Sequence, residues 1–169
     1  MIVSILYGRS WQGVSEATNM LGNAAFSSKF QVQEIIEVAD KSLPVLGSVA
    51  MDKQAIESRQ HEASDYLLVF DSKMDISRVL KQAKDKSVVI LNSQEKIKNP
   101  LLGKKGLRAF FVDATGLAIT ATLKASPYAA MMGAFAKIAG IIPAKYIRSQ
   151  MTGGNLAAFD EGFKGVKRN

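Results

Sequence analysis

The sequence predicts an α/β protein with a Rossmann-like, open, twisted sheet that is mostly parallel and carries helices on both faces. Two continuous apolar runs, residues 66–70 and 88–91, have the length of strands and lack the alternation of a half-exposed strand. Such runs are typical of strands that helices cover on both faces. Segments with helical spacing separate the strand candidates, which is the order that builds a parallel sheet.

The individual elements follow from apolar content and spacing along the chain. The amino-terminal run 1–6 is continuous and apolar except for Ser4, and it leads through a glycine-bounded turn into a segment with helical spacing. Further strands are expected at residues 30–36, 45–51, 66–70, 88–91 and 109–112, and helices at 14–27, 75–83, 115–123, 129–139 and 156–166.

Several boundaries have a local cause. Asp75 is placed to cap the helix that follows it, because its carboxylate can accept hydrogen bonds from the first backbone N–H groups. Asp113 ends a strand just before Ala114, where a helix is expected to begin. Pro127 suits the first turn of the next helix, and Pro143 is expected to stop it.

The longest apolar block covers residues 127–142 and contains Lys137. It falls short of the roughly 20 apolar residues that a membrane-spanning helix needs. A buried helix is therefore expected, with Met131, Met132 and Phe135 in the core or in a subunit contact rather than around a cofactor.

Composition limits the function classes. The 169 residues are 47% apolar and 22% charged, as expected for one globular domain covering residues 1–169. The chain has no cysteine, which excludes disulfides, zinc–thiolate sites and cysteine-ligated iron–sulfur clusters within it. No secretory leader is recognisable, so a cytoplasmic location and no membrane association are expected.

The net charge of +7 is concentrated between residues 81 and 108, a segment that contains no aromatic residue. Nucleic-acid-binding surfaces usually combine basic and aromatic side chains, so a solvated face or a subunit contact is favoured over specific nucleic-acid binding. The basic residues of this segment are Lys81, Lys84, Lys86, Lys96, Lys98, Lys104, Lys105 and Arg108.

The turn after the first strand reads YGRSWQG and is the candidate binding site. Glycines at a strand end and at a helix start let backbone N–H groups approach an anion, and Arg9 adds charge. However, Ser10 stands where the dinucleotide fingerprint has its middle glycine, and no Walker lysine follows, so a plain strand-to-helix turn stays an alternative. The candidate site residues are Gly8, Arg9, Ser10, Trp11, Gln12 and Gly13.

Other catalytic combinations are scarce. His61 is the only histidine and stands in a polar stretch, which suggests a surface position. Without a second histidine or a cysteine, neither a histidine-rich metal site nor a cysteine nucleophile can form. Asp65, Asp71 and Asp113 lie near strand ends, where they are candidates for an active site or for helix caps, and capping is favoured.

Four stretches in sequence order resemble the gamma subunit of the 2-oxoacid:ferredoxin (acceptor) oxidoreductases. Gly8, Gln12 and Gly13 match a G-x-G-G-Q-G loop, and residues 112–115 read V-D-A-T as in the family. Residues 131–135 are similar to the family's M-L-G-A block, and 155–163 resemble its closing N-x-x-A-F-x-x-G-aromatic pattern. The resemblance covers nearly the whole chain.

This resemblance implies an accessory subunit of a complex that oxidatively decarboxylates a 2-oxoacid such as pyruvate to an acyl-coenzyme A. It implies alpha, beta and ferredoxin-like delta partner subunits, and a homo-oligomer is a further possibility. The partners would hold thiamine diphosphate and the iron–sulfur clusters, so this chain alone is expected to hold no cofactor, no metal and no catalytic residue. The loop from Gly8 to Gly13 would face coenzyme A or an adjacent subunit.

The chain departs from the family pattern at three places. Ser10 and Trp11 replace two glycines of the loop, Tyr128 replaces an asparagine before the M-L-G-A block, and residues 37–44 lack the family's G-P-E-x-R-G-like stretch. These departures fall in loops expected to face a ligand. A stand-alone binding or scaffolding module of the same fold is therefore the alternative function.

Overall fold

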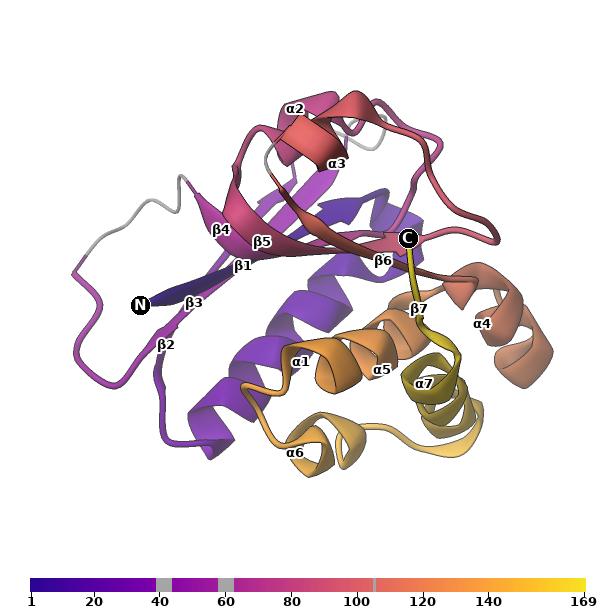
Figure 1. Cartoon of the computed structure of the whole chain (residues 1–169). Helices are drawn as coiled ribbons and strands as arrows, with labels where there is room; N and C mark the ends of the chain where they lie inside the picture. Colours follow the sequence, from indigo (N-terminus) through magenta and orange to yellow (C-terminus); the bar gives the residue numbers. More distant parts are fainter. Residues whose placement is uncertain (39–43, 58–62, 105) are drawn as a thin grey trace.

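Seven strands form one twisted sheet in the order β2-β3-β1-β4-β5-β6-β7 (Figure 1). The structure is a computed structural model that describes residues 1–38, 44–57, 63–104 and 106–169. The strands are β1 (Ile2–Gly8), β2 (Gln31–Val38), β3 (Val45–Asp52), β4 (Ser64–Val69), β5 (Ala83–Asn92), β6 (Arg108–Val112) and β7 (Lys167–Arg168).

The centre of the sheet is parallel and its two edges are antiparallel. β1, β4, β5 and β6 pair with one another in parallel, as the sequence predicts. β3 pairs antiparallel with both β1 and β2, and β7 pairs antiparallel with β6. Only residues 39–44 separate β2 from β3, whereas a parallel crossover needs about a dozen residues or more, so these two strands form a hairpin.

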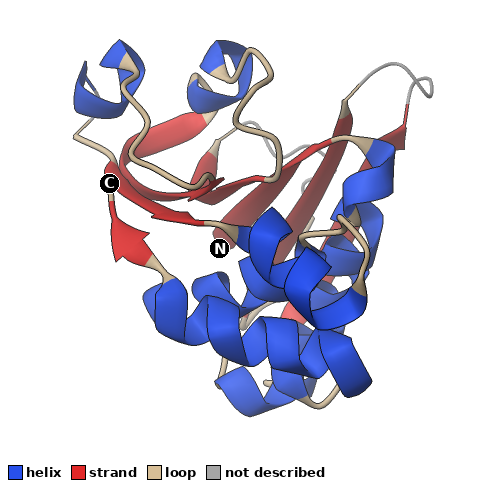
Figure 2. Ribbon diagram, turned by 90° about the vertical axis from the view of Figure 1, so that its right-hand side faces the viewer, coloured by secondary structure: helices blue, strands red, loops and turns tan. Residues whose placement is uncertain are grey.

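Helices cover both faces of the sheet, as predicted, but very unequally (Figures 1 and 2). The short helices α2 and α3 lie on one face of the sheet. Helices α1, α5, α6 and α7 lie on the other face, with α4 at one end of this layer. The helices are α1 (Val14–Ser27), α2 (Ser77–Leu80), α3 (Pro100–Lys104), α4 (Ala114–Thr122), α5 (Tyr128–Ala139), α6 (Ala144–Arg148) and α7 (Gly153–Gly165), and a 3₁₀ turn η1 covers Ser10–Gln12.

Helix α5 lies at the centre of the larger core. Met131, Met132 and Phe135 are buried, which confirms the core position predicted from the apolar block. Phe135 also meets Tyr66 of β4 edge to face, with ring centroids 5.5 Å apart. The helix therefore joins the sheet to the helical layer.

Glycines let α5 and α7 approach each other closely. A Cβ atom on Gly133 of α5 would overlap the backbone carbonyl oxygen of Phe159 in α7, and one on Gly162 of α7 would overlap the carbonyl of Ala130 in α5. Because these neighbours are backbone atoms, no side-chain movement could make room. The M-L-G-A-like block thus has a packing role that depends on its glycine.

The prediction of a helix over residues 75–83 is wrong in extent. Helix α2 covers only Ser77–Leu80, and Ala83 already begins β5, where it pairs with Ser64 of β4. The Ser64 N–H also donates to the carbonyl of Gln82 at 2.8 Å. Gln82 and Ala83 therefore pair with β4 instead of continuing the helix. Asp75 does act at the helix start, since its Oδ1 accepts from the Ser77 N–H at 2.9 Å.

The end of α5 and three small elements also differ from the prediction. Gly140, with φ of +61°, ends α5 in a left-handed cap, and Pro143 instead precedes α6. The short elements α3, α6 and β7 were not predicted, because runs of two to five residues carry too little periodicity. Strand β5 also begins earlier than predicted, since its first residues are polar and exposed.

The basic segment does not form one continuous patch. Lys84 and Lys86 lie at the start of β5, whereas Lys96 and Lys98 follow its opposite end. Lys84 is also paired with Asp65 at 2.8 Å, and Lys105 lies outside the described residues.

Within the described part of the chain, no helix has both the length and the hydropathy of a membrane span.

The close α5–α7 contact predicts that Gly133→Ala destabilises the protein by about 1–3 kcal/mol, because the added methyl group forces two backbones apart. The free energy of unfolding from urea titration measures this effect. Gly165→Ala is the matched control, since a Cβ there has no neighbour within 4 Å. Equal stabilities of the two variants would contradict the glycine-dependent contact.

Candidate functional site

A cleft of about 910 Å³ lies where the central parallel strands end. Its walls come from the segments after β1, β4, β5 and β6 and from the start of α4. The chain leaves β1 toward α1 on one face and leaves β4 toward α2 on the other, and such a divergence is where open α/β sheets commonly bind ligands (Figure 1). The cleft is lined by Trp11, Gln12, Phe70, Asp71, Ser72, Lys73, Asn92, Ser93, Gln94, Glu95, Asp113, Thr115, Gly116 and Ile119.

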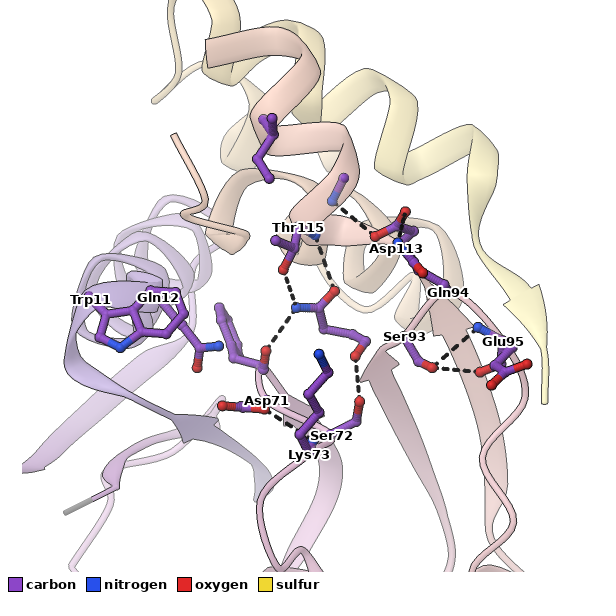
Figure 3. A pocket seen from close by; sticks show the side chains of 14 residues that line it. Trp11, Gln12, Asp71, Ser72, Lys73, Ser93, Gln94, Glu95, Asp113 and Thr115 are labelled. Carbon is purple, nitrogen blue, oxygen red and sulfur yellow. Dashed lines mark hydrogen bonds between the residues drawn. The ribbon is translucent and has the colours of Figure 1, made fainter. Parts of the chain in front are cut away.

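Asn92, at the end of β5, holds three walls of the cleft together, and Figure 3 shows one of its partners, Thr115, beside the cleft. Its Nδ2 donates to the carbonyl oxygen of Phe70 and to Thr115 Oγ1, both at 2.8 Å. Its Oδ1 accepts from the Thr115 N–H at 3.2 Å. Because these bonds reach the end of β4 and the first turn of α4, the amide fixes the relative position of the three segments.

Asp113 begins α4, as the sequence predicts. Its Oδ1 accepts from the Gly116 N–H at 2.9 Å, and its Oδ2 accepts from Gln94 Nε2 at 3.3 Å. The carboxylate therefore serves as a helix cap and also ties down the loop after β5. Both of its oxygens already have hydrogen-bond donors.

The two glycines of the opening loop are explained by packing inside the protein. A Cβ on Gly8 would lie 2.6 Å from Phe70 Cβ and 2.8 Å from Gln12 Oε1. Gly13 has φ of +79°, and a Cβ there would lie 2.8 Å from the ring of Tyr128. Burial, with a smaller effect from Glu16, raises the pKa of the Tyr128 phenol, so this side chain is neutral against the loop.

Gln12 stabilises the loop from within. Its side chain is buried, and its Oε1 accepts from the Arg9 N–H at 2.8 Å. Its own N–H donates to the Arg9 carbonyl at 3.0 Å, which closes the 3₁₀ turn η1. The Arg9 N–H, a donor that a phosphate could use in such a loop, is therefore already occupied.

Arg9 and Asp71 connect the two diverging segments. Arg9 Nε lies 2.9 Å from Asp71 Oδ2, and this pair joins the loop after β1 to the loop after β4. Asp71 Oδ1 accepts from the Lys73 N–H at 3.0 Å. Arg9 is about half exposed, so the pair orients the loops more than it stabilises the fold.

The structure divides the candidate residues between cleft and support. Trp11 and Gln12 line the cleft, while Gly8, Arg9, Ser10 and Gly13 form the loop that carries them. Of the candidate aspartates, Asp71 and Asp113 line the cleft, whereas Asp65 pairs with Lys84 near the starts of β4 and β5. His61 lies outside the described residues.

Sequence reasoning missed Lys73 and Asn92, and it named Thr115 only as part of the V-D-A-T motif. Asn92 ends β5, Thr115 opens α4, and Lys73 stands shortly after β4. The signal available for Asn92 was its position directly after the apolar run 88–91.

Among the described residues, no group of three or more histidine, aspartate or glutamate side chains is arranged to hold a metal ion.

The loop geometry predicts that Gln12→Ala destabilises the protein by about 1–3 kcal/mol, because the Arg9 N–H loses its acceptor. Trp11→Ala, one residue away, should change stability by less than about 0.5 kcal/mol, because Trp11 is 59% exposed. Urea unfolding of both variants compares the two effects. A larger loss in Trp11→Ala would show that the indole supports the fold.

Comparison with known proteins gives a consistent result over most of the chain. Residues 4–165 match the family described as "Pyruvate ferredoxin/flavodoxin oxidoreductase". The "Pyruvate/ketoisovalerate oxidoreductases common subunit gamma" of Thermococcus kodakarensis is 32% identical over 148 residues, which cover 84% of this chain and 80% of that subunit.

Two solved structures share the fold. The pyruvate oxidoreductase subunit PORC of Thermotoga maritima superposes with a TM-score of 0.85 at 22% identity, covering 99% of this chain and 98% of that one. The 2-oxoglutarate:ferredoxin oxidoreductase of Magnetococcus marinus, with 2-oxoglutarate, coenzyme A and succinyl-CoA bound, gives 0.79 at 14% identity. The match covers 96% of this chain but only 30% of that longer chain.

Proposed function

Because the chain belongs to the pyruvate ferredoxin/flavodoxin oxidoreductase family, we propose that it is the gamma subunit of a complex that oxidises a 2-oxoacid such as pyruvate to an acyl-coenzyme A. The observation that supports this most strongly is the match over residues 4–165, which includes the helical core as well as the loops. The chain contributes a subunit rather than a complete active site.

The partners in this proposal are an alpha subunit, a beta subunit and a ferredoxin-like delta subunit. Iron–sulfur clusters need thiolate ligands that a chain without cysteine cannot supply. We assign the clusters, and the thiamine diphosphate that the family resemblance implies, to the partners.

The role assigned to this chain is to present the cleft to coenzyme A. The cleft combines an exposed indole, an apolar side chain from Ile119 and polar groups at the ends of four strands. Its volume is in the range of ligand pockets, which is about 300–1,000 Å³. Trp11 replaces a family glycine and lies at one side of this cleft (Figure 3), so it narrows the site without filling it.

The direct experiment is affinity purification of the tagged protein from its native source, with mass spectrometry of the bound proteins. We expect thiamine-binding and cluster-bearing subunits in fixed proportion, and a preparation that reduces a viologen dye with pyruvate only when coenzyme A is present. A protein that is recovered alone, or only with itself, would support the stand-alone module instead.

A variant of Trp11 tests the cleft within the assembled complex. Trp11→Ala should raise the KM for coenzyme A about three- to tenfold, because loss of one aromatic contact costs about 1 kcal/mol. Phe26→Ala is the matched control, since Phe26 is an exposed aromatic residue near the far end of α1. An unchanged KM in an intact complex would remove Trp11 from the site.

A further inference from the structure

Strand β2 forms one edge of the sheet and is long for an edge strand. It covers eight residues, Gln31–Val38, and within the described part of the chain no strand lies on its far side (Figure 1). Proteins usually protect such an edge with a proline, a lysine, a β-bulge or a very short strand. The sequence of β2, QVQEIIEV, contains neither proline nor lysine, and its pairing with β3 shows no shift in register. The edge is therefore open to a further strand.

The hydrogen bonds of β1 fix the direction of the backbone groups in this half of the sheet. The Val3 N–H donates to Asp65 Oδ2 at 2.9 Å, and the Tyr7 carbonyl accepts from the Phe70 N–H at 2.7 Å. Asp65 belongs to β4 and Phe70 follows it, so the odd-numbered residues of β1 direct their backbone groups toward β4. Because the direction alternates along a strand, the even-numbered residues direct theirs toward β3.

The same alternation passes through β3 into β2. Ser4 of β1 pairs with Val49, whose backbone groups therefore face β1. Its neighbour Ala50 faces the other way, toward its partner Gln33 in β2. The odd-numbered residues of β2 thus bond to β3, and the even-numbered residues present their N–H and C=O groups at the open edge. These outward-facing residues are Val32, Glu34, Ile36 and Val38.

The side chains of these four residues lie on the face of the sheet that α1 covers. Val32 and Ile36 pack on the larger core, and the Glu34 carboxylate lies against Gly22 of α1. Val38, at the end of the strand, is 58% exposed. A strand added at this edge would cover Val38 and would pair the outward-facing backbone groups, and both changes favour association.

A second copy of the chain fits this edge best with a two-fold axis at Ile35. Residues opposite each other in an antiparallel pair lie on the same face, so an odd-numbered residue opposes another odd-numbered one, and the axis passes through a residue position. With the axis at Ile35, every outward-facing residue of one copy opposes an outward-facing residue of the other. The opposed pairs are Val32 with Val38 and Glu34 with Ile36.

The charges of β2 select the same register. The carboxylates of Glu34 and Glu37 then oppose the uncharged side chains of Ile36 and Gln33. An axis one residue earlier, at Glu34, would place two carboxylates directly opposite each other, which is destabilising, and would leave Val38 without a partner in the second strand. The edge is thus complementary to itself, as a symmetric contact between identical chains requires.

We propose that two copies of this chain associate through β2, antiparallel and with Ile35 on the two-fold axis, so that one continuous sheet crosses the dimer. In the assembled oxidoreductase, this contact joins two gamma subunits. Strand β2 contributes no residue to the cleft, so the inference does not depend on the proposed function.

Single cysteines test the register, because the chain has no cysteine of its own. Ile35→Cys should give a disulfide-linked dimer of the full chain under mild oxidation, since Cβ atoms directly opposite each other lie about 4.5–5.5 Å apart. Gln33→Cys and Glu34→Cys are matched controls, because their thiols would be offset along the strands. Non-reducing gel electrophoresis measures the linked fraction. No linkage at residue 35, or stronger linkage at 33 or 34, overturns the inference.

Charges at the same position test the association without oxidation. Light scattering should give the wild-type chain twice the mass of one copy. Ile35→Glu and Ile35→Lys should each lose the dimer, because like charges would stand opposite each other across the axis, and an equal mixture of the two variants should restore it. Ile35 is only half-buried, so both variants should stay folded. A monomeric wild type, or variants that each remain dimeric, would overturn the inference.

Discussion

The side-chain amide of Asn92 is the constraint on which the cleft depends. It joins the end of β4, the end of β5 and the start of α4 through bonds to Phe70 and Thr115. Ser72 adds a bond from its hydroxyl to the Asn92 carbonyl at 2.8 Å, so the loop after β4 is tied to the same residue. Because Lys73 follows directly, its backbone position depends on the same network, and its N–H donates to Asp71 Oδ1 at 3.0 Å.

The two glycines of the opening loop are required by packing within the chain. Phe70 leaves no space for a Cβ at Gly8 and Tyr128 leaves none at Gly13, a reason independent of any ligand. Tyr128, at the start of α5, lies against Gly13, the last residue of the loop. Together with Gln12 and the Arg9–Asp71 pair, these contacts make the loop a support for Trp11.

The sequence predicts well those elements whose cause is local. The apolar runs of β4 and β5, the cap at Asp113 and the buried methionines of α5 depend on neighbours in the sequence, and the structure confirms them. The prediction of a helix over residues 75–83 is wrong because Ala83 pairs with Ser64 of β4. This pairing joins residues that are far apart in the sequence, so no local pattern contains it. The role of Asn92 depends likewise on partners 22 and 23 residues away, so its position after an apolar run could mark it as a strand end but could not show what it binds.

Helix α4 presents apolar side chains both to the cleft and to solvent. It has no charged residue, and its apolar side chains are not confined to one face, a composition typical of a helix that is covered on all sides. Yet Ile119 is 47% exposed, and Leu123 is 89% exposed in a left-handed cap that ordinarily favours glycine. Ile119 also lines the cleft, so a subunit that covered this surface would shield the cleft from water. Assembly and ligand binding would then strengthen each other, since charge interactions in the cleft gain from the loss of solvent.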